Sequence, residues 1–410
     1  MSTIAKLQRI YREYPRQFWL LLAATFIDGL GGALLFPFFT LYLTARFDIG
    51  MTTVGLIFGV FSVSAIAGSI IGGALADRLG RKKMLIFGLI ASALVTLLMA
   101  FVADIRLFFA AAVFVGLLAN VGSPARQAMI ADLLPQEQRA DGYGLLRIVM
   151  NLAVTLGPAI GGFMAARSYL ALFITDAIAS TITAIIVFIF IKETLPQRAE
   201  GEQPESMGTT FKGYFDAFKD QVFMVFLMAA VLINMVYMQM NTTLSVYLRD
   251  VHGVPAQYYG WLISMNALLV VIFQFVVTRW VKRYQPLYVL AVGAFLTAIG
   301  FGMYGIVATY TWFVAAMLVI TLGEMLIAPI AQAVVAMLAP EDMRGRYMAV
   351  YGFSWAIPAA FGTLLAGMMM DYLNPDWVWY ASFVVAGLAG FIYLGLSGKT
   401  HKLDADQVHA

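Results

Sequence analysis

Long apolar runs follow one another through most of this sequence of 410 residues. A helix rises about 1.5 Å per residue, so about 20 apolar residues cross a hydrocarbon core of about 30 Å. The chain is 61% hydrophobic and only 12% charged, and a water-soluble fold could not bury so much apolar surface. A transmembrane β-barrel would instead show alternation over about ten residues. We therefore expect an all-α membrane protein with twelve transmembrane helices, at residues 18–43, 52–76, 84–103, 107–131, 144–165, 169–191, 222–248, 258–281, 287–307, 311–338, 348–370 and 377–396.

Lys and Arg residues set the expected orientation, because they are enriched in loops on the cytoplasmic side. With the N-terminus placed inside, most of the 26 Lys and Arg residues fall on the cytoplasmic side, Arg126 among them. Those on the outside are Arg46, Arg106, Arg167 and Arg249. Arg147 lies within a span near its inner end. We predict a multi-pass protein of the cytoplasmic (inner or plasma) membrane with both termini in the cytoplasm.

The two halves of the chain repeat each other at one fixed offset. Gly55 and Gly260 lie 205 residues apart, and the same offset joins Pro124 to Pro329. It also joins Gly88 to Gly293, Gln127 to Gln332, Pro135 to Pro340, Arg139 to Arg344, Gly157 to Gly362, Gly162 to Gly367 and Tyr42 to Tyr247. Six spans lie in each half, so we expect two parallel six-helix pseudo-repeats around a central cavity, as in a rocking transporter.

A polar stretch separates the two halves. We predict an N-terminal six-helix bundle at 1–191, a cytoplasmic linker at 192–221, a C-terminal six-helix bundle at 222–398 and a cytoplasmic tail at 399–410. The second part of the linker has helical amphipathic spacing, with Phe211, Tyr214, Phe215 and Phe218 beside charged residues. The stretch 4–14 is similar. Both segments are expected to form helices that lie in the membrane interface.

The loop between the second and third spans reads GALADRLGRKK from Gly73 onward. Its motif residues are Gly73, Asp77, Arg78, Gly80, Arg81 and Lys82. Gly80 permits a tight reversal between two helices, and the basic side chains suit the anionic cytoplasmic face of the membrane. The loop resembles the signature G-x-L-a-D-r-x-G-r-k-x of the major facilitator superfamily, at the position where that family has it. The resemblance implies a transporter in which Asp77 and Arg78 latch the halves together in the outward-open state.

The fifth span carries a second pattern of small residues. It comprises Gly144, Ala153, Gly157, Pro158, Gly161 and Gly162. Small residues let a neighbouring helix approach closely, and Pro158 removes a backbone hydrogen bond. Except for Ala153, the spacing resembles the antiporter motif G-x8-G-x3-G-P-x2-G-G of the drug:proton antiporter branch of the same superfamily, which implies export. Gly31 and Pro37 resemble the first-span pattern of that branch, whereas Ala112 stands where the branch often has an arginine.

Three carboxylates lie within the predicted spans, at Asp28, Asp176 and Glu324. A charge at the bilayer centre costs about 3 kcal/mol on insertion scales, so such residues are functional by default. Asp28 and Glu324 fall near mid-depth, on spans that the resemblance places at the central cavity. Burial favours the neutral acid and a water-filled cavity favours the ion, so a carboxyl that alternates between them binds and releases protons. We predict proton coupling at Asp28 and Glu324, with a structural hydrogen bond as the alternative, and a structural role for Asp176.

Polar and aromatic residues on other spans are candidates for the substrate site. They are Asn120, Asn234, Tyr237, Gln239, Asn241 and Trp355. Methionines alternate with several of them, and a Met-rich aromatic wall suits a promiscuous binder of amphipathic molecules. The alternative for any one of these residues is ordinary packing.

Several functional classes are disfavoured by what the sequence lacks. The chain has no Cys and only three His, so a thiol nucleophile is excluded and no metal site is expected. No nucleotide-hydrolysing motif and no nucleophile–base pair is visible. We therefore expect no enzyme activity, no catalytic residue and no cofactor, with a proton gradient as the energy source. The expected partners are a small-molecule substrate and the lipid bilayer but no nucleic acid, and the expected state is a monomer.

The resemblance and the intramembrane acids together predict a secondary active exporter. Its expected substrates are small amphipathic or lipophilic compounds, as in multidrug efflux, and it would work by proton antiport and alternating access. One alternative is an exporter of a specific metabolite such as a sugar, siderophore or amino acid. Another is a non-transporting membrane receptor or partner built on the same fold, which would show no substrate flux.

Overall fold

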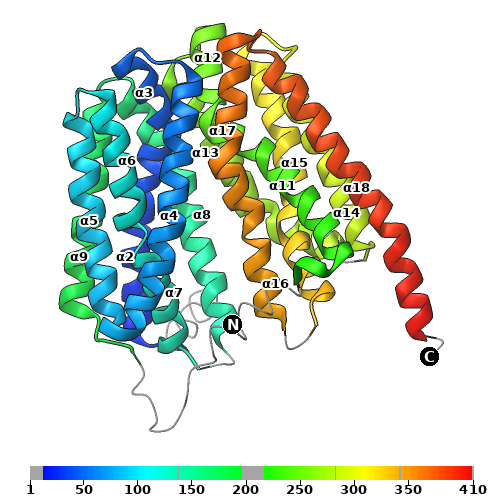
Figure 1. Ribbon diagram of the computed structural model, residues 1–410, viewed down its shortest axis with the longest axis horizontal. Coiled ribbons are helices and arrows are strands. Elements are labelled where there is room, and N and C mark those ends of the chain that lie inside the picture. The colour runs from blue at the N-terminus through cyan, green and yellow to red at the C-terminus, as the bar shows by residue number, and fades with distance from the viewer. Residues whose placement is uncertain (1–12, 136–137, 196–216, 282, 341–342, 409–410) are drawn as a thin grey trace, which may run out of the picture. The chain divides into compact units, whose positions relative to one another are not determined.

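The computed structural model describes residues 13–135, 138–195, 217–281, 283–340 and 343–408. Within these residues every regular element is a helix (Figure 1). The helices are α2 (Arg16–Leu35), η1 (Phe36–Phe38), α3 (Phe39–Phe47), α4 (Met51–Leu79), α5 (Arg81–Phe101), α6 (Ile105–Ala119), α7 (Gly122–Leu133), α8 (Arg139–Ala165), α9 (Tyr169–Phe190), α11 (Gln221–Thr242), α12 (Leu244–His252), α13 (Ala256–Val281), α14 (Pro286–Tyr304), α15 (Tyr310–Leu338), α16 (Arg344–Tyr351), α17 (Phe353–Tyr372) and α18 (Trp377–Val408). Twelve stretches of these residues are long and apolar enough to span a membrane, which confirms the predicted fold class.

Two spans in the first half are interrupted by local breaks. The first changes from α2 to α3 through the 3-10 turn η1, where Pro37 has no N–H to donate to the preceding turn. The fourth is broken between α6 and α7, at Asn120 and Val121. The side chain of Asn120 donates to the carbonyl of Gly116 at 3.0 Å and closes the end of α6. These breaks redirect the chain inside a span and so change which side chains face inward.

The described chain forms two compact units. Unit 1 comprises Met1–Asp48, Val60–Glu200 and Pro255–Ala267, and unit 2 comprises Ile49–Gly59, Gly201–Val254 and Leu268–Ala410. Helices α4 and α13 each contribute one end to unit 1 and the other end to unit 2. The predicted domain boundaries at residues 191 and 222 remain predictions. The tail segment continues α18 to Val408, and the predicted interfacial segments fall mainly on residues 1–12 and 196–216, outside the described residues.

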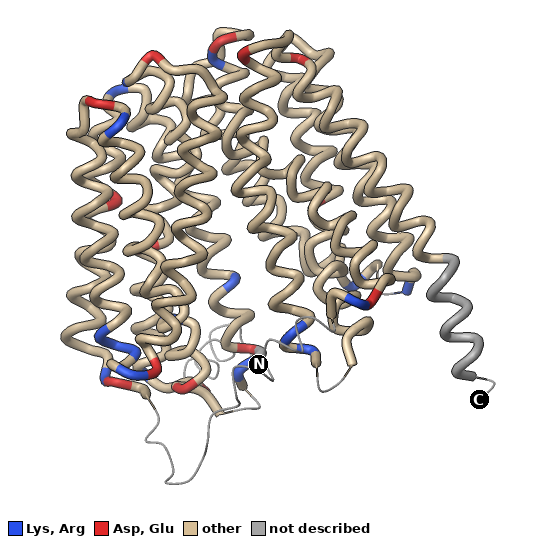
Figure 2. The backbone as a smooth tube through the Cα atoms, in the orientation of Figure 1, with Lys and Arg blue, Asp and Glu red and all other residues tan. Residues whose placement is uncertain are grey.

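Each unit is built around its own apolar core. In unit 1, α2 packs against α8 and α9, and α5 packs against α9 (Figure 1). In unit 2, α14 packs against α15 and α18, and α11 packs against α17 and α18. The charged residues gather at the ends of the helices, and few lie in their middle portions (Figure 2). The few charges inside the spans are therefore the natural candidates for a functional site.

Candidate functional site

An ion pair lies inside unit 1, between α2 and α7. The guanidinium Nη2 of Arg126 lies 2.6 Å from Oδ2 of Asp28, and the two side chains are only 21% and 18% exposed. The second oxygen, Oδ1, accepts a hydrogen bond of 2.9 Å from the hydroxyl of Ser180 on α9. Each carboxylate oxygen therefore has its own donor, and both bonds are charge-assisted.

The break in the fourth span positions Arg126. Helix α7 starts at Gly122 with Pro124 in its first turn, where a missing N–H costs no helical hydrogen bond. One turn later Arg126 points at α2. The charge count placed Arg126 at the cytoplasmic face, but it lies within the span Ile105–Leu133. A basic residue near the end of a predicted span resembles an orientation signal, and this explains why sequence reasoning missed it.

A cavity of about 200 Å³ adjoins the ion pair. It is lined from α2, α5, α6 and α7 and from the break between the last two, by Asp28, Leu85, Gly88, Leu89, Ser92, Ala119, Asn120, Gly122, Ser123 and Arg126. Its hydroxyl, amide and charged groups can bind water, and the volume is large enough for more than one water molecule. Of the predicted substrate-site residues, Asn120 is the one that lines this cavity.

A second carboxyl, Asp176, lies close to Asp28 in the same unit. Its residue is 8% exposed, and its side chain is hydrogen-bonded to that of Thr96 on α5. It faces Gly31 of α2, where an added Cβ would lie 2.9 Å from Oδ1 of Asp176. The glycine therefore allows α9 to bring this carboxyl against α2.

The amide candidates on α11 are already bonded within unit 2. The side chain of Asn234 donates to the carbonyl of Ser354 at 2.9 Å. The side chain of Gln239 donates to the carbonyl of Gly362 at 3.0 Å. Both residues are buried, so these bonds join α11 to α17. The side-chain amides of Asn234 and Gln239 therefore hold α11 and α17 together and do not face open space.

The other candidates in unit 2 differ in exposure. The hydroxyl of Tyr237 is bonded to that of Thr297 at 3.1 Å and lies near Glu324, which is half-buried on α15. Asn241 is half-buried on α11, and Trp355 is 54% exposed on α17. The structure thus places Glu324 near the hydroxyl of Tyr237 in unit 2. The proton-coupling and substrate-binding roles of all these residues remain predictions.

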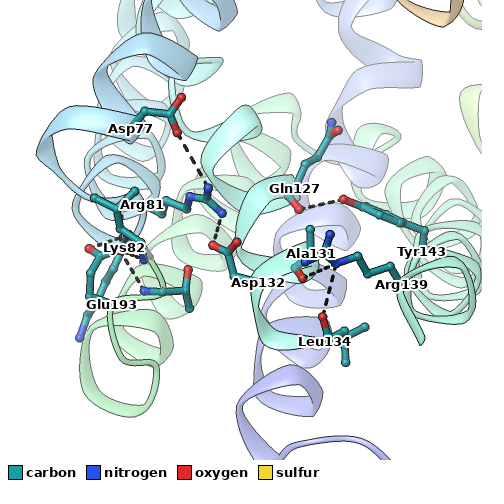
Figure 3. A network of polar contacts seen from close by, with 12 residues as sticks. Asp77, Arg81, Lys82, Gln127, Ala131, Asp132, Leu134, Arg139, Tyr143 and Glu193 are labelled. Carbon is teal, nitrogen blue, oxygen red and sulfur yellow. Dashed lines mark hydrogen bonds and ion pairs between the residues drawn. The ribbon is translucent and has the colours of Figure 1, made fainter. Parts of the chain in front are cut away.

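The loop motif forms a polar network at the junction of α4 and α5 (Figure 3). Gly80 has a φ of 108°, which side-chain-bearing residues rarely adopt, so the glycine is required for the reversal. Arg81 is bonded to Asp132 of α7 and lies 3.9 Å from Asp77. Asp77 and Arg78 are exposed, and Gly73 lies near Pro124 of α7. The motif therefore ties three helices of unit 1 together.

Glu193, which no sequence pattern singled out, caps the start of α5 (Figure 3). Its carboxylate accepts from the backbone N–H groups of Arg81, Lys82, Thr194 and Leu195, at 2.9 to 3.2 Å. Burial alone would raise the pKa of Glu193, but these four donors hold it below its usual value. The side chain of Lys82 donates to the carbonyl of Phe188 at 2.8 Å and so joins α5 to the end of α9.

The small residues of the fifth span produce close packing in unit 1. An added Cβ at Gly157 would lie 2.5 Å from the Cβ of Ala33, and one at Gly161 would lie 2.5 Å from the carbonyl of Leu34. Gly162 packs in the same way against α13, whereas Gly144 has open space around it. Pro158 lies inside α8. The predicted close approach is therefore made mainly to α2, the helix that carries Asp28.

Metal-binding groups of three or more acidic or His side chains are absent from the described residues. The candidate site is accordingly an ion pair with a neighbouring acid and a water-sized cavity. Two carboxyls, one guanidinium and several hydroxyls can bind, exchange and hold protons within a span.

Comparison with known proteins places these features in context. The sequence profile of the Major Facilitator Superfamily matches residues 21–362 and 252–409. A relative from Planococcus maritimus named Na(+), Li(+), K(+)/H(+) antiporter is 27% identical, over 93% of this chain and 96% of its own. The quinolone resistance protein NorA of Staphylococcus aureus is 33% identical, over 38% of this chain and 39% of its own.

Solved structures are similar in fold at low sequence identity. A POT family transporter in complex with 5-aminolevulinic acid has a TM-score of 0.77 at 16% identity, over 94% of this chain and 96% of its own. The nucleoside transporter NupG has a TM-score of 0.75 at 14% identity, over 94% of this chain and 99% of its own. At this identity the likeness bears on the fold alone.

Proposed function

Because this chain belongs to the Major Facilitator Superfamily, and is therefore a membrane transporter rather than an enzyme, we propose that it is a proton-coupled antiporter that exports its substrate. It works by alternating access in the cytoplasmic membrane, with both termini in the cytoplasm. It needs no cofactor and acts as a monomer. The single observation that carries the proposal is the partly buried Asp28–Arg126 pair beside a cavity.

Proton coupling follows from the chemistry of that pair. A proton that reaches Asp28 from the cavity neutralises the carboxylate and removes the partner of Arg126. Breaking a buried pair on one side leaves an uncompensated charge, which costs several kcal/mol. The free guanidinium must then rearrange or bind another anion, so protonation and conformation are linked. Glu324 is the second predicted coupling residue and acts in unit 2.

The substrate we propose first is a small amphipathic or lipophilic compound. The close helix packing at the antiporter-like motif of α8 and the partial similarity to NorA favour this class. A monovalent metal cation is the second candidate, because the relative that this chain matches over 93% of its length is named for sodium, lithium, potassium and proton exchange. Export of a specific metabolite remains a further alternative.

The test is transport by the purified protein in proteoliposomes with an imposed pH gradient. Ethidium and K⁺ serve as probes of the two substrate classes, and a pH-sensitive dye reports proton movement. We expect one probe to move against the proton flow, and Asp28→Asn to abolish that coupling. The matched control is Asp48→Asn, because Asp48 is exposed and its φ of 51° suits Asn. Flux that ignores the pH gradient would replace antiport by facilitated diffusion, and no flux of any compound would favour a receptor.

A further inference from the structure

Helix α9 presents a stripe of three polar residues to α2. Asp176, Ser180 and Thr183 are spaced four and three residues apart, so they share one face of the helix. The hydroxyl of Thr183 donates to the carbonyl of Ala24 at 3.0 Å, and that of Ser180 donates to Asp28 at 2.9 Å. One turn further along the antiparallel pair, Asp176 meets Gly31. The same interface therefore holds both carboxyls, on neighbouring turns.

Among the described residues, the nearest charged group in the surroundings of Asp176 is the Asp28 carboxyl of α2, while α5 contributes the neutral hydroxyl of Thr96. Arg126 of α7 provides the positive charge of this cluster, and its Nη2 is bonded to Asp28. The cluster therefore holds two carboxyls and one guanidinium, and Asp176 is more than nine-tenths buried in it.

Charge balance restricts the protonation states of this cluster. With Asp28 ionised and Asp176 neutral, the cluster carries no net charge. Ionising both acids leaves one uncompensated negative charge, whose desolvation costs several kcal/mol. Protonating both leaves Arg126 without a partner, at a similar cost. Charge balance therefore favours the state with one proton on the two carboxyls.

We propose that Asp176 is a second proton-binding residue of the transport site, and that it exchanges protons together with Asp28, the partner of Arg126. The proposal rests on the proton antiport proposed above and offers an alternative to the structural role that the sequence predicted for Asp176. In each cycle one proton binds to the Asp28 carboxylate and releases Arg126. Loss of the proton from Asp176 gives a second carboxylate beside Asp28, whose charge favours proton binding by Asp28. Each acid therefore changes the proton affinity of the other.

Infrared titration of the full protein in lipid vesicles tests this without any substrate. A protonated carboxyl gives a carbonyl band in the infrared spectrum. We assign to Asp176 the band that the wild type shows at neutral pH and that the Asp176→Asn variant lacks. We expect Asp28→Asn to lose this band as well, because Arg126 then lacks its partner and ionised Asp176 restores the charge balance of the cluster. The double variant Asp28→Asn/Arg126→Gln should regain the band, and Asp48→Asn should keep it. A band that persists in Asp28→Asn, or no such band in the wild type, overturns the proposal.

Transport measurements separate this proposal from the antiport on which it rests. In Asp176→Asn we expect continued exchange of the probe that the wild type carries, with fewer protons moved per cycle and a shifted pH profile. An unchanged proton ratio and pH profile in this variant would refute a second proton site. If wild-type flux ignores the pH gradient, proton antiport fails, whereas the infrared titration still decides whether the two acids are linked.

A second variant covers the case in which Asp176→Asn does not fold. Thr96→Val keeps both carboxyls and the shape of the side chain but removes the hydroxyl that is bonded to Asp176. We expect it to shift the titration midpoint of the Asp176 band and the pH profile of transport. Thr183→Val, which removes the bond to Ala24 on the same helix face, is the packing control and should shift neither. Equal behaviour of the two variants would contradict the proposal.

Discussion

In unit 1 the polar side chains inside the spans meet around an ion pair. In unit 2 two amide side chains of α11 instead bind backbone carbonyls. Asp28, Arg126 and Ser180 form one charged cluster beside a cavity. Asn234 and Gln239 instead join α11 to α17 through neutral hydrogen bonds. A single proton opens an ion pair but leaves an amide–carbonyl bond intact. From this contrast we predict that proton binding is concentrated in unit 1, with Glu324 as the coupling residue predicted in unit 2.

The largest expected effect is at Arg126. Arg126→Leu leaves Asp28 inside the span without its counter-ion, and we expect a loss of about 3–5 kcal/mol in the free energy of unfolding together with loss of proton coupling. The double variant Asp28→Asn/Arg126→Gln removes both charges and should recover most of the stability but not the coupling. Thermal unfolding in detergent and the pH-gradient assay measure the two quantities. If the single and double variants were equally unstable, the loss of stability in Arg126→Leu would not be due to an unpaired Asp28.

A substitution in unit 2 tests the contrast most directly. Glu324→Gln removes the acid of α15, and we expect a smaller loss of proton coupling than in Asp28→Asn, with the transport rate falling by less than about tenfold, the equivalent of roughly 1.4 kcal/mol. The measurement is proton and probe flux from the same vesicles. Loss of coupling in Glu324→Gln with coupling retained in Asp28→Asn would reverse the assignment of the two units.

A smaller effect is expected at the neutral bond between α11 and α14. Tyr237→Phe removes the 3.1 Å hydrogen bond to Thr297, and a buried bond of this kind contributes about 1 kcal/mol to stability. We expect thermal unfolding to shift accordingly while the pH dependence of transport is unchanged. Tyr372→Phe, at a side chain that is 75% exposed, is the control and should have no effect. A changed pH profile in Tyr237→Phe would mean that the bond between Tyr237 and Thr297 takes part in coupling.

The smallest expected effect concerns the cap of α5. Glu193→Gln weakens the bonds to the start of α5, and because the site is exposed we expect a loss of about 0.5 kcal/mol. The pKa of Glu193 is lower in the folded protein than in the unfolded chain, so the wild type has this advantage at neutral pH and loses it as the pH falls through the folded-state pKa. Unfolding measured from neutral to acidic pH should show the two proteins converging. A difference that grows on acidification would contradict the sign of the shift.

The sequence predicted the parts of the fold that depend on local periodicity. The twelve spans follow from apolar run length, and the offset of 205 residues joins positions such as Gly55 and Gly260 in both halves. The sequence also identified Asp28, because a carboxyl inside an apolar run is visible without any contacts. Its partner Arg126 was not recognised, since its role depends on the break at Asn120 that directs α7 toward α2. The face that a helix turns toward its neighbour depends on tertiary packing, and it cannot be derived from the pattern of a single sequence.

The same limit applies to the polar residues of the seventh span. Asn234, Tyr237 and Gln239 lie on an apolar helix, and the pattern predicted side chains for a substrate cavity. Three-dimensional packing gives each of them a bond to a neighbouring helix of unit 2. For Asp176 the sequence favoured a structural role, because the residue lies near the outer end of its span, and the proton-binding role is our proposal. The spacing of Asp176, Ser180 and Thr183 on one helix face was the signal in the sequence that could have linked it to Asp28.

The Asp28–Arg126 pair has an electrical consequence. Membrane voltage performs work on net charge, about 2.3 kcal/mol for each elementary charge that crosses 100 mV. A carboxylate joined to a guanidinium is neutral as a whole, so the voltage performs almost no work on the pair when the surrounding helices shift. The voltage dependence of each turnover is then set by the cargo and the protons that accompany it. A current recording on vesicles would read their charges directly.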